Sequence, residues 1–203
     1  SQQKAAGAIA NGRMAEEIVA AGTLAADEHP RPQTTIEALA KLKAVVRPDG
    51  TVTAGNASGI NDGACALLVA SESAAREHGL QPKARFIASA SAGVAPRVMG
   101  MGPVPATERV LAKAGLALDQ MDIIELNEAF AAQFLSVQKE LGLDLKKTNV
   151  NGGAIAVGHP LGASGTRIMN HLVYELQRRS AKYALGSACI GGGQGIAIII
   201  ERI

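Results

Sequence analysis

Residues 122–142 read DIIELNEAFAAQFLSVQKELG, and this stretch decides the fold class. Its first part is a short apolar run, which predicts a buried strand over residues 122–127. The remainder places apolar side chains at helical spacing, which predicts a helix over residues 128–142. A strand that passes directly into a helix is the repeating unit of a layered α/β domain.

The same alternation continues on both sides of this unit. Gly115 is positioned to end an upstream helix, and Ile168, Leu172 and Leu176 form one apolar stripe on a downstream helix. The last strands are joined by a glycine-rich turn, which predicts a terminal hairpin. The expected elements are a strand over 84–94, a helix over 105–116, a short strand over 148–153, a helix over 162–180 and the hairpin over 182–203.

The first part of the chain is less regular. We expect a helix from Ser1 to about Val19, and a second helix over 34–43 in which Thr34 and Glu37 fit a capping box. The apolar run over 63–71 is expected to be buried, and Gly79 is expected to stop a helix over 72–80. The boundary between the two parts is placed near residues 81–83, so we divide the chain into 1–80 and 81–203.

Composition excludes several classes of protein. With 203 residues, 47% hydrophobic and 19% charged, the chain has the balance of a globular protein. A net charge of +2 and 2% aromatic residues leave no basic stripe or stacking platform for nucleic acid. No apolar run reaches membrane-spanning length, and the start of the chain has no signal-peptide core. Two isolated cysteines favour a reducing compartment, so we expect a cytoplasmic location.

Three residues are candidates for chemistry. His159 lies in a glycine-rich loop before a helix, where backbone N–H groups are close by; the alternative is a loop histidine with local hydrogen bonds. Cys189 precedes the turn IGGGQG, which can aim N–H groups at an oxyanion; the alternative is a buried core cysteine. Asn127 ends a strand, where sites collect in α/β folds, but it could equally be a helix N-cap. Cys65 is interpreted as a core residue.

Other motifs fail on spacing. The loop around His159 lacks the lysine of a phosphate-binding loop and the spacing of a dinucleotide fingerprint. His159, His171 and Cys189 do not have metal-ligand spacing, so we expect no metal. The segment GASG is not a nucleophile elbow.

Taken together, the motifs NEAFAAQ, NVNGGAIAVGHPLGASGTRI and CIGGGQG, in this order, resemble the thiolase family. The segments GTVTAGNASGINDGACAL and VMGMGPVPAT are also similar to thiolase segments, and DEHPRPQTT looks most like acetyl-CoA acetyltransferases and β-ketoadipyl-CoA thiolases. The resemblance covers essentially the whole chain but only the C-terminal half of a thiolase. It implies a layered α/β fold with a mixed five-stranded sheet. Residues 81–203 would form a complete C-terminal half, and residues 1–80 the end of the N-terminal domain with part of the loop domain.

The resemblance also implies an activity: reversible Claisen condensation and thiolysis of 3-ketoacyl-CoA and acetyl-CoA, as in fatty acid metabolism. By similarity, Cys189 is the acid/base thiol, with a pKa that nearby dipoles could tune towards neutral. His159 activates the nucleophile and helps bind the thioester oxygen, and Asn127 holds a water in the same oxyanion hole. Gly191 contributes its N–H to a second oxyanion hole.

Coenzyme A contacts carry over through shorter motifs. Ala54 and Ser58 match pantetheine-loop positions, and Ala129 and Phe130 match residues that line the pantetheine tunnel. Arg31 aligns with a basic residue at the nucleotide end, where a guanidinium suits a phosphate. No cofactor is implied beyond the coenzyme A thioester, which is a substrate.

The family's acylated cysteine has no match in this sequence. We therefore expect the chain alone to be inactive, with the N-terminal half of a thiolase as a required partner and a homodimer or homotetramer as the assembly. The alternative is a non-catalytic acyl-CoA-binding or lipid-transfer module. The presence of Asn127, His159 and Cys189 argues against that alternative, because binding alone needs no acid/base thiol.

Overall fold

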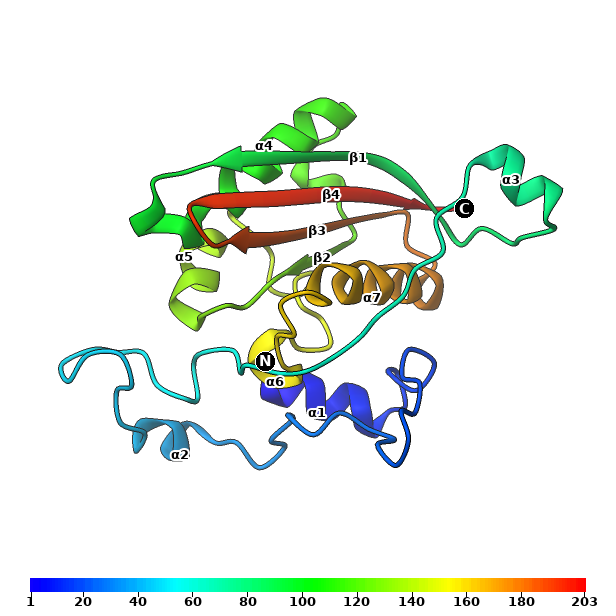
Figure 1. Ribbon diagram of the computed structural model, residues 1–203. Coiled ribbons are helices and arrows are strands. Elements are labelled where there is room, and N and C mark those ends of the chain that lie inside the picture. The colour runs from blue at the N-terminus through cyan, green and yellow to red at the C-terminus, as the bar shows by residue number, and fades with distance from the viewer.

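The computed structural model describes residues 1–203, which are built around a four-stranded mixed sheet (Figure 1). The strand order is β1 (Ala84–Gly93), β4 (Gln194–Arg202), β3 (Tyr183–Ile190) and β2 (Ile123–Leu126). β4 pairs antiparallel with both β1 and β3, while β2 and β3 run parallel. The side chains therefore point to two faces, each of which must be covered.

Helices cover both faces of this sheet. On one face, Val110 of α4 (Pro103–Ala114) and Val137 of α5 (Ala131–Leu141) join a core that includes Ile199 of β4. On the other face, α7 (Ser164–Arg179) packs its apolar stripe against Ile200, the next residue of β4. Adjacent strand residues thus serve opposite cores, and the result is a three-layer α/β/α arrangement.

The remaining elements are short. Figure 1 shows residues 1 to about 70 running below the sheet, on the side of α7. Only three of residues 1–80 are buried, and they are Ala5, Ala8 and Ala75. The core therefore lies almost entirely after residue 83. These short elements are α1 (Gln2–Ala10), α2 (Ile36–Ala40), α3 (Glu72–Glu77), η1 (Pro96–Met101), η2 (Leu118–Gln120) and α6 (Ala154–Val157).

Most of the expected regular elements are confirmed. The strands at 84–93 and 123–126, the terminal hairpin and the helices over 103–114 and 164–179 lie where the patterns placed them. Gly115 ends α4 in the left-handed conformation at φ 65°, and the stripe of α7 is buried. None of the helices combines the length and apolarity needed to cross a membrane.

The expected fifth strand is reduced to a single bridge between Thr148 and Ile124 of β2. Ile124 N–H donates to the Lys147 carbonyl and Asn149 N–H donates to the Ile124 carbonyl, both at 2.9 Å. Asn149 then turns away with φ 45°, which ends the backbone pairing. Its side-chain amide continues the ladder instead, because Oδ1 accepts from Leu126 N–H and Nδ2 donates to the Leu126 carbonyl, each at 2.8 Å.

Several helix boundaries differ from the expectation. α1 ends at Ala10 instead of near Val19, and Gly12 follows with φ 67°. The N-cap of α2 is Thr35, whose hydroxyl accepts from Ala38 N–H. The predicted capping box of Thr34 and Glu37 is wrong, because the Thr34 hydroxyl donates to the Arg31 carbonyl of the preceding turn.

The apolar run over 63–71 is not buried. Leu68 and Val69 are 80% and 84% exposed, and the segment forms neither helix nor strand. The run does approach the loop of His159 at Gly63, where an added Cβ would lie 2.8 Å from Pro160 Cγ. The apolar character of this run was therefore a poor guide to burial within these 203 residues.

Candidate functional site

The site begins where β2 ends. Asn127 N–H donates to the Ser187 carbonyl of β3 at 2.9 Å, so the backbone of Asn127 still belongs to the sheet. Its side chain is 1% exposed and is not a helix N-cap, because α5 starts only at Ala131 after an extended Phe130. Asn127 Nδ2 lies 3.4 Å from His159 Nε2. The strand end and the glycine-rich loop therefore meet at these two side chains.

A second segment holds the loop of His159. His159 N–H donates to Asn61 Oδ1 at 3.0 Å, and Ile60 forms a bridge with His159. Gly158 has φ 96°, and a Cβ there would lie 2.8 Å from Asn61 Cγ, so only glycine allows this approach. Asn61 Nδ2 also lies 3.4 Å from His29 Nδ1.

The imidazole of His159 is half-buried and contacts Ser164, with 2.6 Å between Nδ1 and Oγ. Burial lowers the pKa of His159, and the positive charge of Arg167 lowers it further. The ring is therefore neutral at pH 7 and keeps one unprotonated nitrogen. A neutral imidazole can accept a proton, which is the chemistry expected of a base.

The Asn127 amide has spare hydrogen-bonding capacity. Its Oδ1 is buried and has no hydrogen-bond partner. A buried unpaired acceptor costs about 1–3 kcal/mol, so such a group calls for an explanation. A water or ligand donor at this position would satisfy it.

Cys189 and Gly191 lie on the β3–β4 hairpin at the same edge of the sheet. β2 and β3 are parallel and pair Leu126 with Ser187. Asn127 directly follows β2 and Cys189 is the penultimate residue of β3, so both lie at the carboxyl ends of neighbouring strands. Gly191 is exposed at the start of the turn. The turn is held in place because Val94 N–H donates to the Gly193 carbonyl at 2.8 Å.

The thiol of Cys189 does not match the expected electrostatics. It is half-buried, and this burial raises its pKa, although its own backbone N–H acts in the opposite direction. Within these residues the resting form is the protonated thiol, which is the acid of an acid/base pair. Burial also raises the pKa of Cys65.

Three of the predicted coenzyme A residues contact one another. The backbone N–H and hydroxyl of Ser58 both donate to the Ala129 carbonyl, at 3.0 and 3.1 Å. Phe130 pairs with Ala57 in a bridge and is 36% exposed. The segment around Ser58 therefore lies alongside the loop that follows Asn127.

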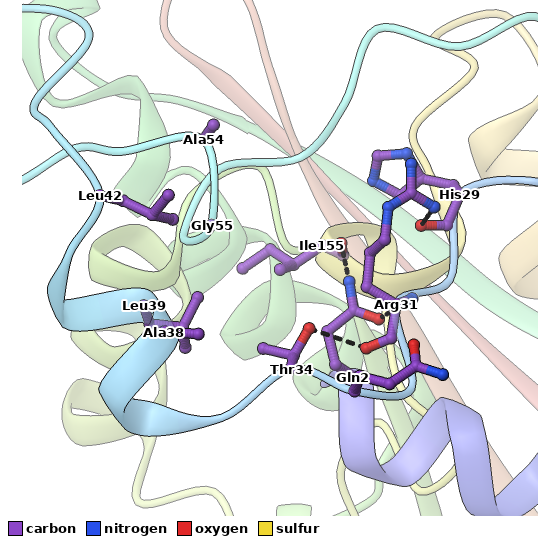
Figure 2. A pocket seen from close by; sticks show the side chains of 11 residues that line it. Gln2, His29, Arg31, Thr34, Ala38, Leu39, Leu42, Ala54, Gly55 and Ile155 are labelled. Atoms are coloured by element: carbon purple, nitrogen blue, oxygen red, sulfur yellow. Dashed lines mark hydrogen bonds between the residues drawn. The ribbon is translucent and has the colours of Figure 1, made fainter.

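The other two, Arg31 and Ala54, line one pocket of about 450 Å³ (Figure 2). Figure 2 shows Leu39 and Leu42 on one side of it and Arg31 on the other. Arg31 Nη1 donates to the carbonyls of Glu28 and His29 at 2.7 and 2.8 Å, so part of its guanidinium is used within its own loop. The pocket has an apolar wall and a cationic end. None of the four candidate catalytic residues lines it.

Behind His159 lies a buried ionic cluster. Arg167 Nη1 is 3.2 Å from Glu125 Oε2, and Glu125 is 1% exposed on β2. His171 lies on the same helix face and contacts Glu17 at 2.8 Å. Burial raises the pKa of Glu125, although the charges of His171 and Arg167 act in the opposite direction. The cluster ties β2 and residue 17 to α7.

The predicted residues thus form separate groups: Asn127 with His159, Cys189 with Gly191, Ser58 with Ala129 and Phe130, and Arg31 with Ala54. The sequence motifs did not indicate Asn61, Ser164, Glu128 and Asn149, which contact or position these groups. Glu128 is 5% exposed and accepts from Asn149 Nδ2 at 3.0 Å and from Ile155 N–H at 3.1 Å. Only the position of Ser164 at the expected helix start offered a signal. No group of three or more potential ligands is placed to hold a metal ion.

Two protein-family descriptions match the chain. Residues 1–73 match "Thiolase, N-terminal domain" and residues 80–202 match "Thiolase, C-terminal domain". The mitochondrial 3-ketoacyl-CoA thiolase of Mus musculus is 62% identical over 180 residues, which are 89% of this chain and 45% of that protein. The β-ketoadipyl-CoA thiolase of Acinetobacter baylyi is 55% identical over 214 residues, covering 100% of this chain and 53% of that protein.

Solved structures agree with these matches. The Bacillus anthracis acetyl-CoA acetyltransferase has a TM-score of 0.95 at 45% identity, covering 100% of this chain and 54% of that one. Human mitochondrial 3-ketoacyl-CoA thiolase in complex with CoA has a TM-score of 0.92 at 51% identity, covering 100% and 52%. These structures confirm the expected layered α/β fold. The chain spans about half the length of the curated relatives it matches.

Proposed function

Because the chain belongs to the thiolase family, we propose that it takes part in acyl transfer between coenzyme A thioesters. The reaction is the reversible Claisen condensation of two acyl-CoA molecules and its reverse, thiolysis of a 3-ketoacyl-CoA. The observation that carries the proposal is the contact between Asn127 and a neutral His159 at the carboxyl ends of the parallel strands, where Cys189 also lies.

Each of these residues has a role that suits its surroundings. The neutral His159 accepts the proton of an attacking thiol, and afterwards its N–H stabilises the oxyanion that forms on the thioester carbonyl. Asn127 supplies an amide next to that oxygen, and its unpaired Oδ1 accepts from a bound water. Cys189 gives its proton to the α-carbon of the leaving acetyl-CoA in thiolysis and removes that proton in condensation. Gly191 offers a backbone N–H to the second carbonyl.

The acylated cysteine is a separate question. A thioester-forming nucleophile needs a thiol that ionises readily, and burial raises the pKa of both cysteines of this chain. Cys189 also already holds the acid/base role. We therefore assign the acylated cysteine to sequence outside these 203 residues.

Coenzyme A is proposed to bind across two of the observed groups. Ser58, Ala129 and Phe130 would contact the pantetheine arm near the reacting thioester, and Ala54 and Arg31 would contact the part of the ligand nearer the nucleotide. The apolar wall and cationic end of the pocket in Figure 2 support this direction, since the nucleotide end carries the phosphates. The relative solved in complex with CoA supports the choice of ligand.

The setting of the protein is also proposed. A cytoplasmic location rests on the two free cysteines, although several of the relatives are mitochondrial. We propose a homodimer or homotetramer, and residues 1–80 and 81–203 as parts of two domains. No nucleic acid or membrane partner is proposed, since the net charge is only +2.

The test is a thiolysis assay on a single-chain chimera. Residues 1–203 replace the matched portion of the Acinetobacter baylyi relative, and acetoacetyl-CoA and 3-oxoadipyl-CoA are offered with free coenzyme A. We expect turnover, and we expect Cys189→Ala to lower kcat at least about 100-fold. Cys65→Ala is the matched control and should leave kcat within a few-fold.

A folded chimera that binds coenzyme A but cleaves neither thioester would contradict the proposal. That outcome would favour a non-catalytic acyl-CoA-binding module. Equal activity of Cys189→Ala and the unaltered chimera would remove the acid/base assignment alone.

A further inference from the structure

Ser164 is the first residue of α7 and is 4% exposed, yet none of the roles above uses it. Its hydroxyl oxygen makes two close polar contacts. It lies 2.6 Å from His159 Nδ1 and 2.9 Å from the carbonyl oxygen of Pro160. The helix start places it there, because the Ser164 backbone N–H also donates to the Pro160 carbonyl at 2.8 Å.

Ser164 has a single hydroxyl proton, so it can donate only one of these two hydrogen bonds. A carbonyl oxygen has no proton to give, so a 2.9 Å approach of two oxygens is favourable only if the Ser164 hydroxyl donates to Pro160. Ser164 Oγ can then only accept from His159, and the ring proton must be on Nδ1. On the other side of the ring, Asn127 Nδ2 lies 3.4 Å from Nε2, and because an amide NH2 can only donate, a hydrogen bond there requires an unprotonated Nε2. Both sides of the imidazole thus point to the same tautomer.

We propose that Ser164 is a positioning residue that holds His159 in its Nδ1–H tautomer and leaves the Nε2 lone pair facing Asn127. Ser164 acts through His159 and does not touch the substrate. The catalytic part of this inference rests on the proposed function. There, the arrangement presents the basic Nε2 to the incoming thiol before the reaction begins. In the other tautomer the lone pair would face Ser164, and Nε2 could not accept a proton.

The tautomer can be measured on the 203-residue chain without any assay. Two-bond proton–nitrogen correlation spectra of the 15N-labelled chain distinguish a protonated Nδ1 from a protonated Nε2. His159 is assigned by comparison with a His159→Gln variant. At pH 7.5 we expect the Nδ1–H pattern for His159.

Variants then separate the hydroxyl from its surroundings. Ser164→Ala removes the acceptor and should shift His159 towards a mixture of tautomers, whereas Ser164→Thr keeps a hydroxyl and should restore the original pattern. Ser136→Ala is the matched control, because Ser136 makes the same kind of bond to the carbonyl four residues earlier, at 2.7 Å, on α5. It should leave the His159 signals unchanged.

In the chimera, Ser164→Ala should lower kcat about 10-fold or more with little change in KM, and Ser164→Thr should recover most of the lost kcat.

An Nε2–H pattern in the unaltered chain would overturn the proposal, as would identical spectra of Ser164→Ala and the unaltered chain. The spectra are independent of turnover. An inactive chimera with the expected tautomer would therefore contradict the acyl-transfer function and leave the role of Ser164 standing.

Discussion

Asn149 does with one side chain what two backbone groups of a strand would otherwise do. Its side-chain amide pairs with both the backbone N–H and the backbone carbonyl of Leu126, the residue directly before Asn127. Replacing Asn149 by Ala would leave the N–H and carbonyl of Leu126 unpaired in a buried position. Each such group costs about 1–3 kcal/mol, so we expect a loss of about 3 kcal/mol in the free energy of urea unfolding.

The matched control is Asn170→Ala on α7. Asn170 is half-buried and makes none of the observed side-chain hydrogen bonds, so its replacement should change stability by less than about 0.5 kcal/mol. Asn149→Asp keeps the size of the side chain but removes the donor and adds a charge beside Glu128. It should be at least as destabilising as Asn149→Ala, and near-wild-type stability of either would refute this account.

Single residues of the site were predictable only where the neighbouring sequence distinguishes them. His159 stood out because glycines surround it, and Asn127 because it ends a strand. Ser164 and Asn61 did not stand out, since a serine at a helix start and an asparagine in a loop are common and act through side-chain contacts that spacing does not encode. The electrostatics of Cys189 were also outside the reach of sequence, because burial of a thiol depends on the surrounding fold.

At the scale of elements, β4 and α4 meet through two glycines. A Cβ on Gly195 would overlap the backbone of Gly102, and a Cβ on Gly102 would overlap the backbone of Gln194. Backbone atoms cannot move aside as a flexible side chain can. We therefore expect Gly195→Ala to lower the melting temperature strongly, by an amount equivalent to about 3 kcal/mol.

Gly165 offers the contrasting control. It lies in the first turn of α7 and keeps an ordinary helical φ, and a methyl group added to its Cα would have no neighbouring atom within 4 Å. Gly165→Ala should raise stability by about 0.5–1 kcal/mol, because alanine favours helix over the unfolded chain. If both substitutions had the same effect, close packing at Gly195 would not be the cause.

The helices and strands of residues 84–203 were largely predictable because the period of the apolar residues, the glycine caps and the observed burial agree there. The terminal hairpin shows this, since successive residues of its last strand pack into the cores on opposite faces of the sheet. The elements of residues 1–80 were not, because apolar patterning predicts burial only if a partner surface is present. The run over 63–71 has the composition of a core strand and remains exposed. The missing fifth strand has a local cause, the positive φ of Asn149.

At the scale of the whole molecule, an ionic network joins the first part of the chain to α7. Arg178 contacts both Glu17 and Glu175, and Arg179 contacts Glu175. Burial acts to raise the pKa of Glu175, but hydrogen bonds from Arg179 and Arg178 prevail and lower it to about 2. The pKa of Glu17 is lowered as well, because the interactions with His171 and Arg178 outweigh burial.

These shifts predict how stability depends on pH. A carboxylate whose pKa is lower in the folded than in the unfolded state stabilises the folded protein at any pH above its unfolded pKa of about 4.5. This contribution is lost as the pH falls towards its folded pKa of about 2. We expect the melting temperature to fall between pH 4.5 and pH 2. Glu175→Gln should reduce this fall, and Glu72→Gln, whose partner Arg76 is fully on the surface, should not.

His171 titrates in the opposite direction. Burial acts to lower its pKa, but the hydrogen bond and charge of Glu17 and the charge of Glu125 prevail and raise it. The stabilisation is therefore complete below the unfolded pKa of about 6.5 and is lost as the pH rises through the folded value. Stability that keeps rising above neutral pH, as followed by thermal unfolding, would contradict the pairing of His171 with Glu17.

The turn at Asn149 has a consequence for how the sheet can grow. Beyond β2 the chain offers only two backbone hydrogen bonds before Asn149 bends away and fills the last positions with its own amide. A foreign strand arriving beside β2 finds no continuous row of N–H and carbonyl groups to pair with, so this lateral edge of the sheet is protected against aggregation by strand addition. The opposite border, β1, is ten residues long and is interrupted only by the register shift between Phe86 and Ala88. Amyloid-like recruitment, if it starts from the folded sheet, has one side of the molecule from which to begin.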